Sequence, residues 1–153
     1  MATTTAIPTT DTTLFMNRTF KAPREEVFRA WTTPDKLTQW FAATKDHAGS
    51  IGEVDLRVGG RFRMGMKHMP TGNDHIATGV YKEVRFPERL VFTWSWEGKP
   101  EHGESRITID LRDVDGGTEM HFTQEFFPGR KERDDHEGGW NGCFEKLRTL
   151  IEA

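Results

Sequence analysis

The chain lacks most of the features that mark secreted or membrane-bound proteins. Cys143 is its only cysteine, so an internal disulfide framework is excluded. Its apolar runs span only a few residues, whereas a membrane-crossing helix needs roughly 20. No charged leader with an apolar centre and a small-residue cleavage site opens the sequence. From these absences we expect a cytoplasmic protein with no membrane partner.

Patterns for nucleic acids, metals and phosphates are also missing. The net charge is -3 and Lys and Arg form no block, which argues against a nucleic-acid partner. The 6 histidines show no paired metal-binding spacing, and a lone cysteine cannot complete a thiolate zinc site, so we expect no metal. The glycine pairs lack the context of a phosphate loop, so we expect no nucleotide and no other cofactor.

The length and composition predict one domain. The chain has 153 residues, 35% of them hydrophobic, which is enough to bury a core. Its first dozen residues are rich in threonine and almost devoid of large apolar side chains, so we expect residues 1–12 to form a disordered tail. Residues 13–153 are then a single domain.

Two short helices are predicted after a first strand that runs from about Thr12 to Ala22. Pro23 suits the first turn of a helix, and the segment Thr33 to Asp35 repeats the start signal. Apolar side chains recur at helical spacing in both segments. They are Val27, Phe28 and Trp31 in the first, and Leu37, Trp40 and Phe41 in the second.

From Ile51 to Phe127 the pattern changes to period two, which predicts an antiparallel meander. Gly59 and Gly60 indicate a tight hairpin in it. Side chains that share one parity should face the interior. They are Phe62, Met64, Met66, Leu90, Phe92, Trp94, Trp96, Ile107, Ile109, Leu111, Met120, Phe122, Gln124 and Phe126.

A long amphipathic helix is predicted at the C-terminal end. Asp134 and Asp135 suit a helix N-terminus, where negative charge is favoured. The apolar stripe consists of Trp140, Cys143, Phe144, Leu147, Leu150 and Ile151. Cys143 lies on this stripe and is therefore expected to be a buried hydrophobe rather than a nucleophile. Gly138 and Gly139 cost helix stability, so we expect the sheet to approach their bare backbone closely.

Several segments, in order, resemble one family. They are APREEVFRAWTTPDKLTQWF, VGGRFR, GVYKEVRFPERLVFTW, GGTEMHFTQEFF and HEGGW. From about Thr13 to its end the chain is similar to bacterial homologues of the activator of heat-shock-protein-90 ATPase, within the SRPBCC (START and birch-pollen-allergen-like) superfamily. The resemblance implies an α+β helix-grip fold, in which a curved antiparallel sheet wraps a long C-terminal helix and leaves an elongated cavity. It does not imply a reaction.

A cavity between the sheet and the final helix is the predicted ligand site, because concave apolar spaces are the usual small-molecule sites. Strand parity and the helix stripe define its expected lining, with Trp40 and Phe41 near the mouth. The predicted ligand-binding residues are Trp40, Phe41, Phe62, Met64, Met66, Tyr81, Trp94, Trp96, Ile109, Met120, Phe122, Gln124, Trp140 and Phe144. The alternative is that these side chains simply fill the interior.

Few polar residues qualify for chemistry, and each has a plainer reading. Gln124 could orient a ligand or satisfy a neighbouring backbone group. The mixed parity around Tyr81 favours an outward hydroxyl over an inward one. His68 shares the parity of the inward methionines, although an exposed strand end explains it better. Glu53 and Asp55 could form an acid-base pair but are more typical of a solvated strand face.

Three functions therefore stay open. The favoured one is non-catalytic binding of an unidentified hydrophobic small molecule, with no catalytic residue. The second is a cyclase- or hydratase-type enzyme that uses Gln124, Tyr81 or His68. The third is a regulator of a chaperone ATPase; the resembled eukaryotic co-chaperone also uses a separate N-terminal module, which this chain is too short to contain, so a chaperone partner is not expected. The sequence also leaves open a weak homodimer through an edge strand.

Overall fold

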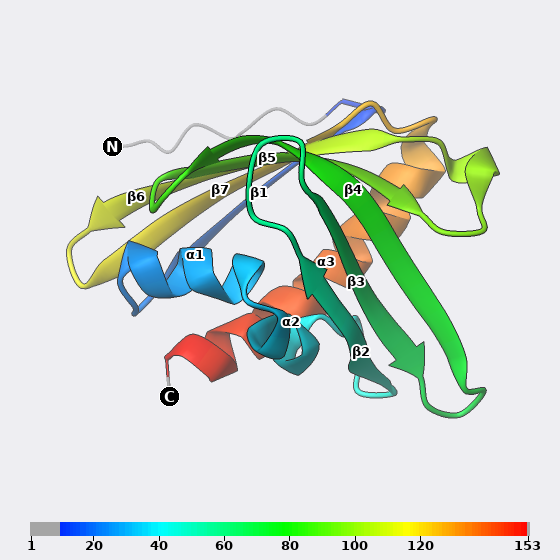
Figure 1. The fold of residues 1–153 in the computed structure, drawn as a ribbon, viewed down its shortest axis with the longest axis horizontal. Coiled ribbons are helices and arrows are strands. Elements are labelled where there is room, and N and C mark those ends of the chain that lie inside the picture. Colours follow the sequence, from blue (N-terminus) through cyan, green and yellow to red (C-terminus); the bar gives the residue numbers. More distant parts are fainter. Residues whose placement is uncertain (1–9, 153) are drawn as a thin grey trace.

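The computed structural model describes residues 10–152 as one curved sheet with helices on its concave side (Figure 1). The strands are β1 Thr13–Phe20, β2 His47–Val54, β3 Arg61–His68, β4 Asn73–Arg85, β5 Arg89–Trp96, β6 Ser105–Val114 and β7 Gly117–Glu125. The helices are α1 Arg24–Thr32, α2 Pro34–Trp40, α3 Arg130–Ile151 and the single 3-10 turn η1 Pro100–His102. The predicted α+β helix-grip fold is confirmed.

The sheet has 7 strands in the order β1-β7-β6-β5-β4-β3-β2, and every pair is antiparallel. Strands β2 to β7 therefore form the predicted meander, and β1 adds to its far edge beside β7. α3 runs diagonally across the concave face, while α1 and α2 cover the remainder of that face (Figure 1). The arrangement buries the apolar side of the sheet, as its alternating pattern requires.

The helices follow the predicted signals, with one shift. Pro23 precedes α1 and Pro34 opens α2, and their expected apolar positions are buried. α3 begins at Arg130, directly after the Pro128-Gly129 break, so Asp134 and Asp135 lie in its second turn instead of its first. The acidic residue of the first turn is Glu132.

An aromatic cluster fills the centre of the molecule. Trp31 of α1 lies in the middle, with its ring centroid 4.7 Å from that of Trp40 and 5.6 Å from that of Trp140. Phe122 of β7 and Phe144 of α3 pack at 5.4 Å on the far side. Contacts of this kind lie in the 4.5 to 7 Å range of favourable aromatic pairs. The α1–α2 segment therefore occupies much of the space between the sheet and α3.

Two breaks in strand parity correct an expectation. Tyr81 is 1% exposed and packs against Phe62 and Phe92, although we expected it to face outward. A bulge in the β4–β5 pairing lies between Tyr81 and Glu83, and it moves the inward side from odd to even positions.

The second break follows the end of β7. We expected Phe126 to be buried, but it is 58% exposed and Phe127 is buried in its place. β7 ends at Glu125, and Phe126 adopts a φ of 73°, which reverses the direction of the chain before α3. The alternation of buried and exposed side chains therefore ends at Glu125, whereas the prediction extended it to Phe126.

The β2–β3 connection is also longer than the predicted tight hairpin. β2 ends at Val54 and β3 begins at Arg61, so residues 55–60 form the loop. Gly59 and Gly60 nevertheless lie in its turn, because the Gly60 N–H donates to the Arg57 carbonyl at 2.8 Å and Gly59 adopts a φ of 86°. They exchange backbone hydrogen bonds with Tyr81 of β4, with N to O distances of 2.9 Å.

Most of the predicted disordered tail, residues 1–9, lies outside the described residues. In the described part, Asp11 pairs with Arg130 of α3 at 2.9 Å. The Thr12 carbonyl accepts a hydrogen bond from the Phe127 backbone N–H at 3.0 Å. Residues 10–12 therefore contact the start of the last helix.

Candidate functional site

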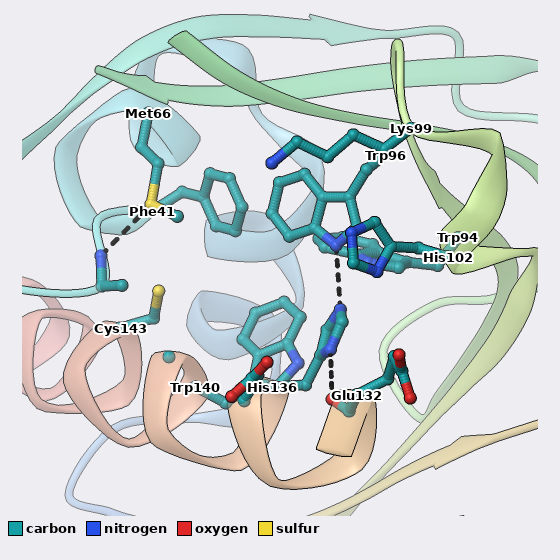
Figure 2. A pocket seen from close by; sticks show the side chains of 13 residues that line it. Phe41, Met66, Trp94, Trp96, Lys99, His102, Glu132, His136, Trp140 and Cys143 are labelled. Atoms are coloured by element: carbon teal, nitrogen blue, oxygen red, sulfur yellow. Dashed lines mark hydrogen bonds between the residues drawn. The ribbon is translucent and has the colours of Figure 1, made fainter. Parts of the chain in front are cut away.

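A pocket of about 220 Å3 opens between β5, the turn η1 and the first half of α3 (Figure 2). The loop after α2 and the inward face of β3 complete its walls. Its lining residues are Phe41, Ala43, Met66, Trp94, Trp96, Lys99, His102, Glu132, Asp135, His136, Gly139, Trp140 and Cys143.

Aromatic rings form most of the wall. Trp94 is 5.2 Å from Trp140 and 5.4 Å from Trp96 between ring centroids, and Phe41 lies 5.9 Å from Trp140. Trp94 and Trp96 reach the same side because they are two residues apart on β5. The site is therefore built from a strand and a helix that meet face to face.

His136 of α3 links the helix to β5. The Trp96 Nε1–H donates to His136 Nε2 at 2.9 Å, and His136 Nδ1 lies 2.7 Å from the Glu132 carbonyl oxygen (Figure 2). An indole nitrogen only donates and a carbonyl only accepts, so this arrangement requires a neutral ring with its proton on Nδ1. Burial, the largest influence, lowers the pKa of His136 below its ordinary value of 6.5.

Small side chains make room for the pocket on the opposite wall. A Cβ added at Gly139 would meet only the Ala43 methyl, at 3.8 Å, so the helix backbone itself lines the space there. The Ala43 backbone N–H donates to Met66 Sδ at 3.3 Å and holds that side chain across the pocket (Figure 2). Burial raises the pKa of the Cys143 thiol to about 12, so the sulfur stays protonated.

Gly138 and Gly139 of α3 do not have the role that we expected. Nothing lies within 4 Å of a Cβ built at Gly138, and the sheet does not approach Gly139. The close approach occurs at Gly142, where a Cβ would lie 1.7 Å from the Ala43 carbonyl oxygen. The contact is with the loop after α2 and not with the sheet.

The structure brings only some of the predicted ligand-binding residues to the pocket. Those that line it are Phe41, Met66, Trp94, Trp96 and Trp140. The others lie in the packed interior and do not line this pocket: Trp40, Phe62, Met64, Tyr81, Ile109, Met120, Phe122, Gln124 and Phe144. Trp40, expected near the mouth, is 0% exposed and its Nε1–H donates to the Ala30 carbonyl at 2.8 Å.

Gln124 is a link between elements. Its Oε1 accepts a hydrogen bond from Trp140 Nε1–H of α3, and its Nε2 donates to Ser105 Oγ of β6, both at 2.9 Å. Both ends of the amide are thus occupied by protein groups.

The remaining polar candidates lie elsewhere. His68 Nδ1 is 2.9 Å from Thr71 Oγ1 at the end of β3. Glu53 pairs with Arg63 and Asp55 with Arg57, each at 3.0 Å. These carboxylates are therefore neutralised on the solvent side and do not form an acid-base pair.

Sequence reasoning missed the polar half of the lining. Lys99 and His102 come from a turn that has no strand parity, and Glu132 and Asp135 lie in a stretch where the start of α3 was placed too late. His136 could have been found, because it precedes Trp140 by four residues and so shares its helix face.

A second recess of about 150 Å3 adjoins the pocket. Met66, Trp96 and Lys99 line both spaces. His47 and His75 complete the smaller one. The two spaces therefore meet at the shared side chains, on the side of β2 to β4.

Residues 10–152 contain no helix that is both long and apolar enough to span a bilayer. Within the same range, no cluster of three or more His, Cys, Asp or Glu side chains is arranged to hold a metal ion.

Comparisons with known proteins agree with the fold. Residues 21–152 match the family model described as Activator of Hsp90 ATPase homolog 1-like protein. The chain is 30% identical over 145 residues to Activator of 90 kDa heat shock protein ATPase homolog 1 of Homo sapiens, and equally so to its Mus musculus counterpart. These matches cover 95% of this chain but only 38% of either relative.

Solved bacterial structures are similar over nearly their whole length. Protein CV1439 from Chromobacterium violaceum aligns with a TM-score of 0.85 and 27% identity, covering 93% of this chain and 98% of that one. The AHSA1-like protein from Aeromonas hydrophila aligns with a TM-score of 0.74 and 23% identity, over 90% and 93% of the two chains, and supports the fold alone. With a family model that covers almost all of its domain, the chain belongs to the Activator of Hsp90 ATPase homolog 1-like family.

Proposed function

We propose that this chain is a cytoplasmic, non-catalytic binding protein for a hydrophobic small molecule, held in the pocket between β5 and α3. The observation that supports it is an open space walled by Trp94, Trp96, Trp140 and Phe41 beside an otherwise packed interior. Water is poorly accommodated against large aromatic side chains. An apolar ligand that covers this apolar area therefore gains hydrophobic binding energy. The volume of about 220 Å3 lies below the usual range for drug-sized ligands, which favours a compound of one or two rings.

The chemistry of the lining favours binding over catalysis. Both nitrogens of His136 are already engaged, so the ring has no free site for proton transfer. The Cys143 thiol is buried and its pKa is raised. The groups we considered for a cyclase or hydratase, which are Gln124, Tyr81 and His68, do not line the pocket.

Isothermal titration with 2-naphthalenemethanol, a neutral two-ring probe, tests the proposal. We expect saturable binding by the wild-type protein. Gly139→Leu should abolish it, because the new side chain grows from a bare backbone position that lines the pocket. Gly138→Leu is the matched control, since its Cβ meets open space outside the pocket, and it should bind like wild type.

Two outcomes would count against the pocket. Absence of binding to the wild-type protein would remove the proposed function. Equal affinity in wild type and Gly139→Leu would place the probe elsewhere on the molecule.

Regulation of a chaperone ATPase is a second candidate. It is favoured by the 30% identity to the human activator homolog over 95% of this chain, which nevertheless spans only 38% of that relative. The test is the ATPase rate of a purified 90 kDa heat shock protein with and without an excess of this chain. An unchanged rate would discard the candidate.

The open edges of the sheet suggest a weak homodimer as a further proposal. β1 and β2 are the two edge strands, and an unpaired edge can pair with a second copy. Light scattering across a concentration series would detect the dimer, and a constant monomer mass would exclude it.

A further inference from the structure

We infer that the ligand is an organic anion: a one- or two-ring apolar body in the main pocket, with a carboxylate in the adjoining recess beside Lys99, His47 and His75. This rests on the proposed function and names the chemical class that the same site would take. Four features support it: an unpaired ammonium group, a recess without acidic lining, the position of the carboxylates on the other wall, and the two histidines that line the recess.

Lys99 is the only lysine of the lining and has no ion pair within the described residues. The acidic residues beside it in sequence already have partners, because Glu97 pairs with Arg63 at 2.7 Å and Glu101 lies 3.9 Å from His102. In Figure 2 the Lys99 side chain extends over the Trp96 ring toward the Met66 side of the pocket. A partly buried ammonium at the edge of an aromatic pocket would gain from a ligand carboxylate.

The smaller recess contains no acidic side chain. Its lining consists of Met66, Trp96, Lys99, His47 and His75, so each nitrogen-bearing side chain in it is able to donate a hydrogen bond or carry positive charge. Since it shares three side chains with the main pocket, one ligand can reach both. A ligand with an apolar body and an attached anionic group matches the apolar main pocket and the nitrogen-lined recess beside it.

The acidic residues of the main pocket do not oppose that placement. Asp135 is held by Lys131 at 2.9 Å. Glu132 projects from the first turn of α3, on the opposite side of the view from the Lys99 amine (Figure 2). A cationic ligand would have to place its charge beside Glu132 and would leave the positive charge of Lys99 without a partner. A cation is therefore less favoured than an anion.

The two histidines of the recess add a pH dependence. In the free protein the pKa of His47 is lowered by burial and by the nearby His68, His75 and Lys146, against the weaker opposite effect of Asp46. The pKa of His75 is lowered by burial, Lys99 and His68, against Asp74. A bound carboxylate would stabilise the protonated rings and raise both pKa values, so binding takes up protons and should tighten as the pH falls from 8 to 6.

The test compares three probes that share one ring system: 2-naphthoate, 2-naphthalenemethanol and 2-naphthalenemethylamine, each titrated calorimetrically. For the wild-type protein we expect the naphthoate to bind about tenfold more tightly than the alcohol, as one charge-assisted contact at a half-exposed site would provide. This preference should widen between pH 8 and pH 6. At pH 8, where the two histidines add little charge, Lys99→Met should reduce this preference to about onefold, and Lys99→Arg should retain most of it.

The matched control is Lys82→Met, which removes an exposed lysine on β4 that does not line either space, and it should keep the tenfold preference. Equal binding of naphthoate and alcohol, tighter binding of the amine, or an unchanged preference in Lys99→Met would each overturn the anion assignment while leaving the proposed function intact. Failure of all three probes to bind would overturn both.

Discussion

Gly142 carries the tightest backbone contact of α3, and its neighbours Gly138 and Gly139 do not. A Cβ at Gly142 would lie 1.7 Å from the Ala43 carbonyl oxygen, whereas one at Gly138 meets nothing within 4 Å. A rigid backbone atom cannot move aside as the end of a flexible side chain can. The three glycines of one helix therefore differ: Gly142 allows close packing, Gly139 borders the open space of the pocket, and Gly138 does neither.

This contrast predicts opposite effects of the same substitution. Gly142→Ala should lower the free energy of unfolding by about 2 kcal/mol or more, because α3 and the loop at Ala43 must separate. Gly138→Ala should raise it by about 1 kcal/mol, since alanine is the better helix former and the space is open. Urea denaturation measures both. Equal effects of the two substitutions would contradict the assignment.

His136 should make the stability of the protein depend on pH. Its pKa is lowered in the folded state, so below about pH 6.5 the unfolded chain binds more protons than the native one. The stabilisation is complete above that pH and is lost as the pH falls through the lower folded pKa. The limiting slope for one such group is about 1.4 kcal/mol per pH unit.

Denaturation between pH 5 and 8 checks this. His136→Phe should show a shallower slope in the acid range, with the remainder due to His47 and His75, whose pKa values are also lowered. An unchanged slope in His136→Phe would refute the assignment.

Between elements, Gln124 provides one of the hydrogen-bonded ties between α3 and the sheet. This buried amide receives the Trp140 Nε1–H of the helix and donates to Ser105 of β6. A buried donor that loses its acceptor costs about 1 to 3 kcal/mol, which exceeds the net gain from making the bond. The side chain that looked like a ligand group in the sequence therefore positions one wall of the pocket.

A double-mutant cycle should detect this tie. Gln124→Leu leaves the indole N–H of Trp140 unpaired and should cost about 2 kcal/mol of unfolding free energy. In the background of Trp140→Phe, which has no N–H, the same change should cost about 1 kcal/mol less. Additive losses in the double variant would show that the two side chains are not coupled.

Across the molecule, the packing of α1 and α2 decides how much of the concave face stays open. Trp31 and Trp40 enter the aromatic cluster beside Phe144 and are almost completely buried. The space that they leave open lies beside the first half of α3, where Gly139 and Ala43 have side chains too small to fill it. The helix-grip arrangement thus provides a short pocket at one end in place of the elongated cavity that the resemblance implies.

Ligand binding should therefore stabilise the whole domain. At a 2-naphthalenemethanol concentration of 100 times its Kd, the unfolding free energy should rise by about 2.7 kcal/mol. For a chain of this size that is a Tm increase of roughly 5 to 11 °C. Differential scanning calorimetry measures it, with Gly139→Leu as the variant that should not respond. A wild-type Tm that stays constant at saturating probe would contradict binding to the native state.

Local sequence patterns were enough to predict the strands, the three helices and most of the buried face, because these depend on periods of two and 3.6 residues that local geometry imposes. Leu90, Phe92 and Trp94 are buried as their parity predicted, and so are Trp140, Cys143 and Phe144 of α3. Which of these side chains fill the core and which line the pocket became clear only from the folded arrangement. That choice depends on the bulge after Tyr81, on how deeply Trp31 enters and on the turn that carries Lys99, and these follow from contacts between distant segments, which no local period records.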